Sequence, residues 1–226
     1  MEVSEVIKER YSCRKFLNKE VDKELLFECI ELGKQAPSSK NTQPWKICVV
    51  KGNPLKLLVD DLVKAAKEKQ PFSPDYSFEP KKLPEIQQQR AKKCGHDLFK
   101  LKGVGRDDMI KRNAHMLENF EFFGAPVVIF AYLDKSIQGD CSKGMYLDAG
   151  LFIQNLWLSI RNSGLEACVL YSVLLYSPLI RKYTMIPENT EIICAMAVGY
   201  PDNEAIVTTF RTEKMELSEF VTYIED

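Results

Sequence analysis

The chain has almost no excess of either charge. Its 31 lysine and arginine residues are balanced by 32 aspartate and glutamate residues, and the formal net charge at pH 7 is −1. Proteins that attract nucleic acid or an anionic membrane surface through their overall field usually carry a clear positive excess. We therefore expect neither nucleic acid nor a membrane among the partners of this chain.

Cysteine and histidine are too sparse and too scattered for a disulfide framework or a metal site. The seven cysteines are an odd number without a CxxC pair, and the chain has only two histidines. Scattered thiols of this kind are typical of a reducing compartment. We predict a cytoplasmic protein without a bound metal.

Long apolar segments are also missing. The longest apolar run without a charge, residues 167–180, is shorter than the ~20 residues that a membrane-spanning helix needs. The N-terminal residues carry charges throughout, so we expect no secretory signal there. The 226 residues are enough to bury about 70% of the surface that the unfolded chain exposes, which suits a single domain over residues 1–226.

Apolar periodicity predicts an α+β domain. Helical spacing covers residues 22–35, 53–69, 107–122 and 142–162, with a short helix near 177–184. Short β-branched runs predict buried strands at 45–51 and 125–133, and further strands at 167–171 and 191–198. The helix at 142–162 is apolar nearly all round, so we expect it to be buried on all sides, in the core or in a subunit interface.

Residues 70–105 differ from the rest of the chain. A stretch rich in proline and aromatic residues is followed by a charged stretch with one amphipathic helix near 84–101. Long connections of this kind inside a domain are often functional. Two interpretations remain open: a lid or insertion beside a binding site, and a solvated surface excursion.

Polar residues alternate in the segment RYSCRKF near the N-terminus. Arg10, Ser12 and Arg14 lie at positions i, i+2 and i+4, so they share one face if the backbone is extended. The two arginine side chains then leave the backbone roughly 13 Å apart, which spans an anionic ligand lengthwise. A helical backbone would turn Ser12 away, and two solvated arginines are then the better interpretation.

The stretch APSSKNTQPW, residues 36–45, joins a predicted helix to a predicted strand. It places Ser38, Ser39, Asn41 and Gln43 between two prolines. Serine and asparagine accept turn conformations and donate from backbone and side chain, so such a loop offers convergent donors to a flat polar ligand. An ordinary connection between two elements is the alternative.

Together these segments resemble the nitroreductase family of FMN-dependent oxidoreductases. The resemblance covers nearly the whole chain and is carried by the Arg-x-Ser-x-Arg element, APSSKNTQPW, FFGAPVVIFAYLD, YLDAGLFIQNLWLSIRNSGLEACV and AVGYP. Residues 76–124 resemble the subgroup that includes nitrobenzoate reductases. The resemblance implies a central, mostly antiparallel sheet flanked by helices, and an intertwined homodimer with FMN at the subunit interface.

The resemblance also implies which residues bind the cofactor. Arg10 and Ser12, with Tyr11 between them, match the phosphate and ribityl end, and Arg14 matches the cation near flavin N1 and the C2 carbonyl. The residues that match the loop of the partner subunit lining the flavin are Pro37, Ser38, Ser39, Asn41 and Gln43.

Two further segments complete the implied site. Leu170, Tyr171 and Ser172 match the place where family members offer backbone amides to flavin N5 and O4. Arg211 and Lys214, in FRTEK, match the basic element that closes over the phosphate. Lys214 stands where the family has arginine, so both residues are candidates for that contact.

The activity that this resemblance implies is ping-pong hydride transfer from NADH or NADPH, through flavin N5, to a nitroaromatic, a quinone or a related small acceptor. The flavin carries the chemistry, so no catalytic side chain is expected beyond the electrostatic role of Arg14. Two alternatives remain open. One is a flavoenzyme of the same fold with another reaction, such as dehalogenation or flavin cleavage, and the other is a non-catalytic flavin-binding redox sensor or carrier.

Overall fold

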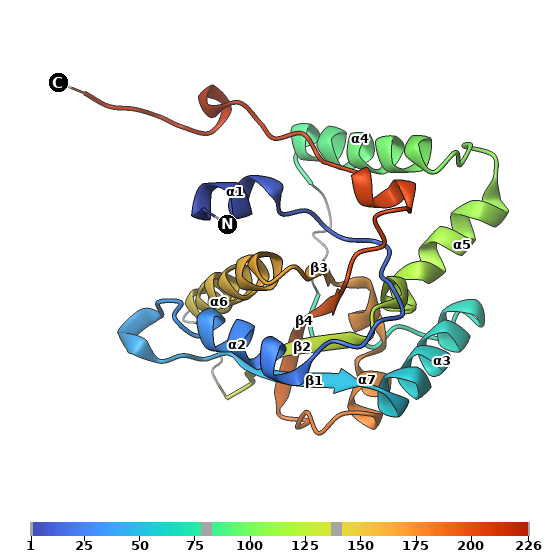
Figure 1. Ribbon diagram of the computed structural model, residues 1–226, viewed down its shortest axis with the longest axis horizontal. Helices are drawn as coiled ribbons and strands as arrows, with labels where there is room; N and C mark the ends of the chain where they lie inside the picture. The colour runs from blue at the N-terminus through green and yellow to red at the C-terminus, as the bar shows by residue number, and fades with distance from the viewer. Residues whose placement is uncertain (1, 78–82, 137–141, 226) are drawn as a thin grey trace.

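A four-stranded antiparallel sheet forms the centre of the molecule (Figure 1). The computed structural model describes residues 2–77, 83–136 and 142–225. The strands are β1 (Lys46–Lys51), β2 (Val127–Asp134), β3 (Glu166–Leu170) and β4 (Thr190–Gly199), in the order β1-β2-β4-β3. Each neighbouring pair is antiparallel, which confirms the predicted sheet.

Apart from α1, which the apolar periodicity did not indicate, the helices agree closely with the predicted ranges. They are α1 (Val3–Glu9), α2 (Lys23–Gly33), α3 (Asn53–Lys67), α4 (Glu85–Leu101), α5 (Met109–Phe120), α6 (Ser142–Asn162) and α7 (Ser177–Lys182). Asp22 caps α2 by accepting a hydrogen bond from the Leu25 N–H at 2.9 Å. The predicted helix near 84–101 is confirmed as α4.

Helices cover both faces of the sheet, because successive side chains of a strand point to opposite sides. Val128 and Phe130 of β2 join one core with residues of α3, α5 and α7. Val127 and Ile129 join the other core with residues of α2 and α6. The strand expected to be buried at 45–51 is instead an edge strand whose residues are mostly half-buried or exposed.

Helix α6 is not buried on all sides within one chain. Phe152, Leu156 and Ile160 are buried, whereas Leu147 is 66% exposed and Leu151 is 39% exposed. Burial in the core of one chain therefore does not account for the whole helix, and the alternative of a subunit interface stays a prediction. Helix α6 carries more apolar residues than pack into the core of its own chain, so one apolar face of the helix is exposed to solvent.

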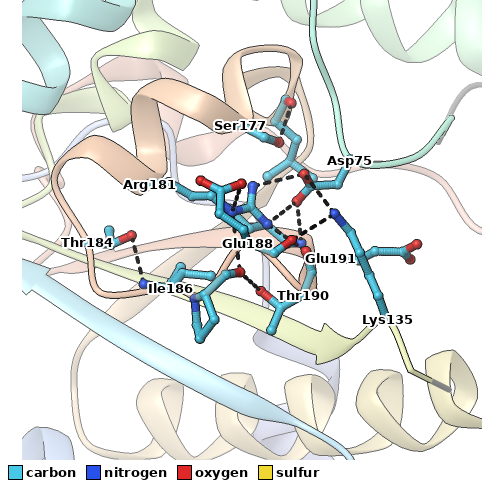
Figure 2. A network of polar contacts seen from close by, with 12 residues as sticks. Asp75, Lys135, Ser177, Arg181, Thr184, Ile186, Glu188, Thr190 and Glu191 are labelled. Atoms are coloured by element: carbon cyan, nitrogen blue, oxygen red, sulfur yellow. Dashed lines mark hydrogen bonds and ion pairs between the residues drawn. The ribbon is translucent and has the colours of Figure 1, made fainter.

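The start of the predicted lid is fixed to the sheet by a buried ion pair (Figure 2). Arg181 of α7 donates through Nη1 and Nη2 to the two carboxylate oxygens of Asp75, both at 2.8 Å, and also to the Thr190 carbonyl. The Ile192 N–H donates to the same carboxylate at 2.8 Å. Tyr76 adds a hydrogen bond to the Ile193 carbonyl at 2.8 Å. These contacts hold residues 75 and 76 against β4, while residues 78–82 of the predicted lid lie outside the described residues.

The far end of the same segment packs on the C-terminal part of the chain. Leu98 of α4 clusters with Val207 and Phe210, next to the predicted phosphate residue Arg211. Lys102 bonds Glu118 at 2.6 Å and so ties the end of α4 to α5. Among the described residues, no helix combines the length and apolar character that crossing a membrane requires.

Candidate functional site

The segment RYSCRKF is extended, which is the first of the two backbone conformations considered for it. Helix α1 ends at Glu9, and the Cys13 N–H donates at 3.0 Å to the carbonyl of Ala167 on the edge strand β3. Tyr11 and Cys13 are buried, whereas the three alternating polar residues Arg10, Ser12 and Arg14 are only half-buried. The polar residues therefore share the open face of the segment.

This face forms one wall of a cavity of about 520 Å³, which we call the first cavity. The C-terminal segment lines the same cavity with Arg211 and Lys214, so these cations and Arg10 border one space. Of the residues that the family resemblance assigns to the cofactor, those lining this cavity are Arg10, Tyr11, Ser12, Arg14, Arg211 and Lys214. Two segments almost 200 positions apart thus meet at one cationic site.

Three arginines of the first cavity, Arg10, Arg14 and Arg211, contact aromatic rings and carbonyls. The guanidinium carbon of Arg211 lies 3.7 Å from the centre of the Tyr11 ring, and that of Arg10 lies 4.2 Å from the Trp157 ring. Arg14 donates to the Ser12 carbonyl at 3.2 Å. Within the described part of the chain none of these arginines forms an ion pair, so their charge remains available to an anion.

The electrostatics of Arg10 favour an anionic ligand. Burial lowers the pKa of Arg10, and the nearby cation Arg211 acts in the same direction. An anion that pairs with both Arg10 and Arg211 offsets the burial of Arg10 and the repulsion between the two cations. The first cavity is therefore suited to a phosphate or carboxylate group.

Two cations that line the first cavity, Lys8 and Arg161, were missed by the sequence reasoning. Arg161 of α6 bonds Glu9 at 2.7 Å and forms a closer ion pair with the buried Glu166. These bonds tie the end of α1 to the start of β3, directly beside Arg10. A charged residue near the end of an otherwise apolar helix was the available signal.

The thiols beside the first cavity are not reactive groups. Burial raises the pKa of Cys13 to about 11 and that of Cys168 to about 11. Neither forms the nucleophilic thiolate near neutral pH. The six cysteines that the structure describes are free, and Cys141 lies outside the described residues.

The loop at residues 36–43 does not reach the first cavity in this chain. It runs between α2 and β1, away from the segment that follows α1 (Figure 1). Its predicted ligand-binding residues Pro37, Ser39, Asn41 and Gln43 are exposed, and Ser38 is half-buried. The structure thus separates these five residues from Arg10 and Arg14.

The backbone of this loop is held in a strained form. Lys40, Asn41 and Gln43 have φ angles of 52°, 57° and 46°, in the left-handed region that non-glycine residues rarely adopt. The Ser39 N–H donates to Asp148 of α6 at 3.1 Å, and the Gln43 N–H donates to the Ser38 hydroxyl at 2.9 Å. Strain that the surroundings maintain is common at functional sites.

The third predicted segment lies where β3 ends. Leu170 is buried, Ser172 is half-buried and Tyr171 is 50% exposed. Because Cys13 bonds to Ala167 of β3, this strand runs beside the extended arginine segment. The segment therefore lies on the same strand edge as the first cavity without lining it.

The sequence similarity agrees with this geometry. The sequence pattern of the nitroreductase family matches residues 7–200. The chain is 32% identical to a 4-nitrobenzoate reductase of Pseudomonas putida over 206 residues, covering 91% of this chain and 88% of the relative.

Solved structures of similar proteins share the fold. The FMN and NADPH-dependent nitroreductase NfnB from Sphigopyxis sp. strain HMH superimposes with a TM-score of 0.93 at 28% identity, over 100% of both chains. The FMN-dependent nitroreductase NfnB from Mycobacterium smegmatis, in complex with NADPH, gives 0.91 at 27% identity over 98% of this chain and 97% of that chain. The match of the family pattern over residues 7–200 shows that the chain belongs to the nitroreductase family.

Proposed function

We propose that this chain is an FMN-dependent oxidoreductase that takes hydride from NADH or NADPH and passes the electrons to a nitroaromatic, quinone or related acceptor in a ping-pong cycle. The observation that carries the proposal is the first cavity, where Arg10, Arg14 and Arg211 converge without an ion-pair partner among the described residues. When bound, FMN supplies the redox chemistry at its N5 position.

The residues of the first cavity fit a phosphate group and the chain attached to it. Arg10, Arg211 and Lys214 offer charge-assisted donors to a phosphate dianion. Arg14 lies two positions beyond Ser12 on the same face, where a cation stabilises negative charge on the ring. The Tyr11 ring packs against the guanidinium of Arg211 and so limits the orientation of that group.

A homodimer is part of the proposal, because one chain leaves two features unused. The exposed apolar residues Leu147 and Leu151 of α6 are suited to a subunit interface. The loop at residues 36–43 holds a strained set of donors away from its own first cavity. A second copy of the chain that packs on α6 allows each loop to line the cofactor of its partner.

We keep the single domain with a lid at about 70–105 as part of the proposal. The Asp75–Arg181 pair and the packing of Leu98 on Phe210 support a segment that is fixed at both ends. Such a segment shapes a pocket without moving as a whole. A cytoplasmic location remains our prediction from the sparse, scattered cysteines.

Anaerobic spectroscopy tests the proposed function. We expect the purified protein to be yellow and its flavin band to be bleached by NADH or NADPH. After the nucleotide is removed, 4-nitrobenzoate or a quinone should restore the band, as a ping-pong cycle requires. A yellow protein that neither nucleotide bleaches would indicate a flavin sensor or carrier. A colourless protein that takes up no added FMN contradicts the proposal.

A further inference from the structure

A second and larger cavity lies outside the site described above. Its volume is about 950 Å³, and it is enclosed by the start of α3, the end of α5 and the segment at residues 205–207. Helices α3 and α5 lie next to each other on one side of the molecule (Figure 1). Among the residues that the structure describes, Arg14 alone lines both cavities.

Apolar residues from several elements contribute to the wall of the second cavity. Leu55 and Val59 of α3, Phe123 and Ala125 before β2, and Val207 contribute to it. Val59 is half-buried and the other four are buried, so they belong to a packed surface and not to mobile tips. A ligand with a flat apolar body gains free energy by covering this wall.

The rim of the second cavity carries an excess of positive charge. Four cations, Arg14, Lys15, Lys56 and Lys102, and two carboxylates, Glu118 and Glu121, line it. Lys102 is already neutralised by Glu118 at 2.6 Å. Lys15 and Lys56 form no ion pair with any residue of the described chain.

The start of α3 adds to this positive potential. The N-cap residue Gly52 lines the cavity, and no side chain caps the helix. The first-turn amides of a 15-residue helix therefore keep a partial positive charge beside Lys56. The lysine charge and the helix N-terminus therefore both make the electrostatic potential of the second cavity more positive.

We propose that the second cavity binds an aromatic carboxylate. Its carboxylate pairs with Lys15 and Lys56, and its ring covers the wall formed by Leu55, Val59 and Phe123. A bare phosphate would meet the two lysines but leave the apolar wall in water. An uncharged aromatic compound would cover the wall but leave both ammonium groups without a partner.

The shared residue Arg14 couples the two cavities, an effect that rests on the proposed function. An anion in the second cavity lowers the positive potential that Arg14 offers to FMN in the first. Because linkage is reciprocal, FMN then weakens the binding of the carboxylate by the same factor. We expect a decrease of a few fold in each direction.

Titration calorimetry with benzoate tests the binding site directly, because benzoate carries no reducible group. We expect a Kd of about 1 mM for the purified protein, in the range of a small ligand with few polar contacts. The double variant Lys15→Gln/Lys56→Gln should raise this Kd at least about fivefold. The matched variant Lys64→Gln/Lys67→Gln removes two lysines from the same helix outside the cavity and should leave it unchanged.

Benzamide serves as the neutral isostere and should bind at least about fivefold more weakly than benzoate. Equal affinity of benzoate for the wild type and for Lys15→Gln/Lys56→Gln would overturn the proposal, and so would equal binding of benzamide and benzoate. The FMN content of both double variants is measured in parallel. If Lys15→Gln/Lys56→Gln loses benzoate binding but keeps a normal FMN content, the result supports a binding site in the second cavity whether or not the proposed function holds. If the wild type binds benzoate but takes up no FMN, the result refutes the proposed function and leaves the second cavity supported.

Discussion

The first cavity and the loop at residues 36–43 differ in how far a single chain completes them. In the first cavity, Arg10 and Arg211 come from opposite ends of the sequence and already face the same space. Among the described residues, the hydrogen bonds of the loop join its own residues, Gly33 of α2 and Asp148 of α6, and Asn41 is exposed in a left-handed conformation. One chain thus completes the cationic cavity but leaves the loop apart from it, which is the arrangement expected for the proposed site shared between two chains.

A charge on the exposed apolar face of α6 should have the greatest effect, because it would destabilise the proposed dimer. Leu151→Arg should weaken the proposed dimer at least about a hundredfold, because an unpaired guanidinium is forced into an apolar interface. FMN affinity should fall with it, since the loop of the partner is lost. Sedimentation velocity and FMN titration measure the two effects. Met185→Arg, at a residue that is 96% exposed, is the control. A monomeric variant with normal FMN affinity would show that the loop is not part of the site.

A change in the first cavity alone should weaken FMN binding without affecting the dimer, and this effect should be the next in size. Arg10→Ala should raise the Kd for FMN about thirtyfold, because a charge-assisted contact to the phosphate is lost. The oligomeric state should not change. Fluorescence titration with FMN measures the affinity, and Arg106→Ala, outside the first cavity, is the matched control. Normal FMN affinity in Arg10→Ala argues against a phosphate contact.

A smaller effect is expected where the chain meets the flavin ring. Arg14→Ala should lower the midpoint potential of bound FMN by about 30 mV, because the cation that stabilises the reduced form is gone. Thermal stability should change little, since Arg14 bonds only the carbonyl of Ser12 among the described residues. Anaerobic redox titration of the holoprotein measures the potential. An unchanged potential in the loaded variant contradicts this role of Arg14.

The smallest effect concerns the strain in the loop. Lys40 has a φ angle of 52°, so Lys40→Gly should raise the free energy of unfolding by about 1 kcal/mol. The same change at Lys64, inside α3, should lower it by about 1 kcal/mol. Urea denaturation measures both. A loss of stability in Lys40→Gly would mean that the loop is not strained.

The sequence predicts the elements that depend on local pattern. The alternation in RYSCRKF predicts a shared face of Arg10, Ser12 and Arg14 only for an extended backbone, in which side-chain direction follows from position alone. The structure supplies that condition, because the segment is extended beside β3. Asp22 correctly marks the start of α2 for the same local reason. The sheet direction and helix positions follow from apolar period and from the family resemblance.

Contacts between distant residues could not be predicted in this way. Arg181 and Asp75 are 106 positions apart, and nothing in either segment indicates the other. Arg161 was missed because its place beside Arg10 depends on how α6 packs against α1. The strand at 45–51 was expected to be buried, but the order of the strands decides which of them lies at an edge.

The central claim is that the first cavity of one chain and the loop of its partner form one flavin site. Mixed dimers test it, with Arg10→Glu on one chain and Ser39→Trp on the other. A different affinity tag on each chain allows the mixed dimer to be purified away from the homodimers. Neither homodimer should retain FMN.

In the mixed dimer one site carries both defects and the other carries none, so the account predicts one FMN per dimer. Placing both substitutions on one chain, paired with a wild-type chain, should give no FMN, because each shared site then has one defect. The opposite result, no FMN in the first mixed dimer and one in the second, would show that each chain builds its site alone and would contradict the account.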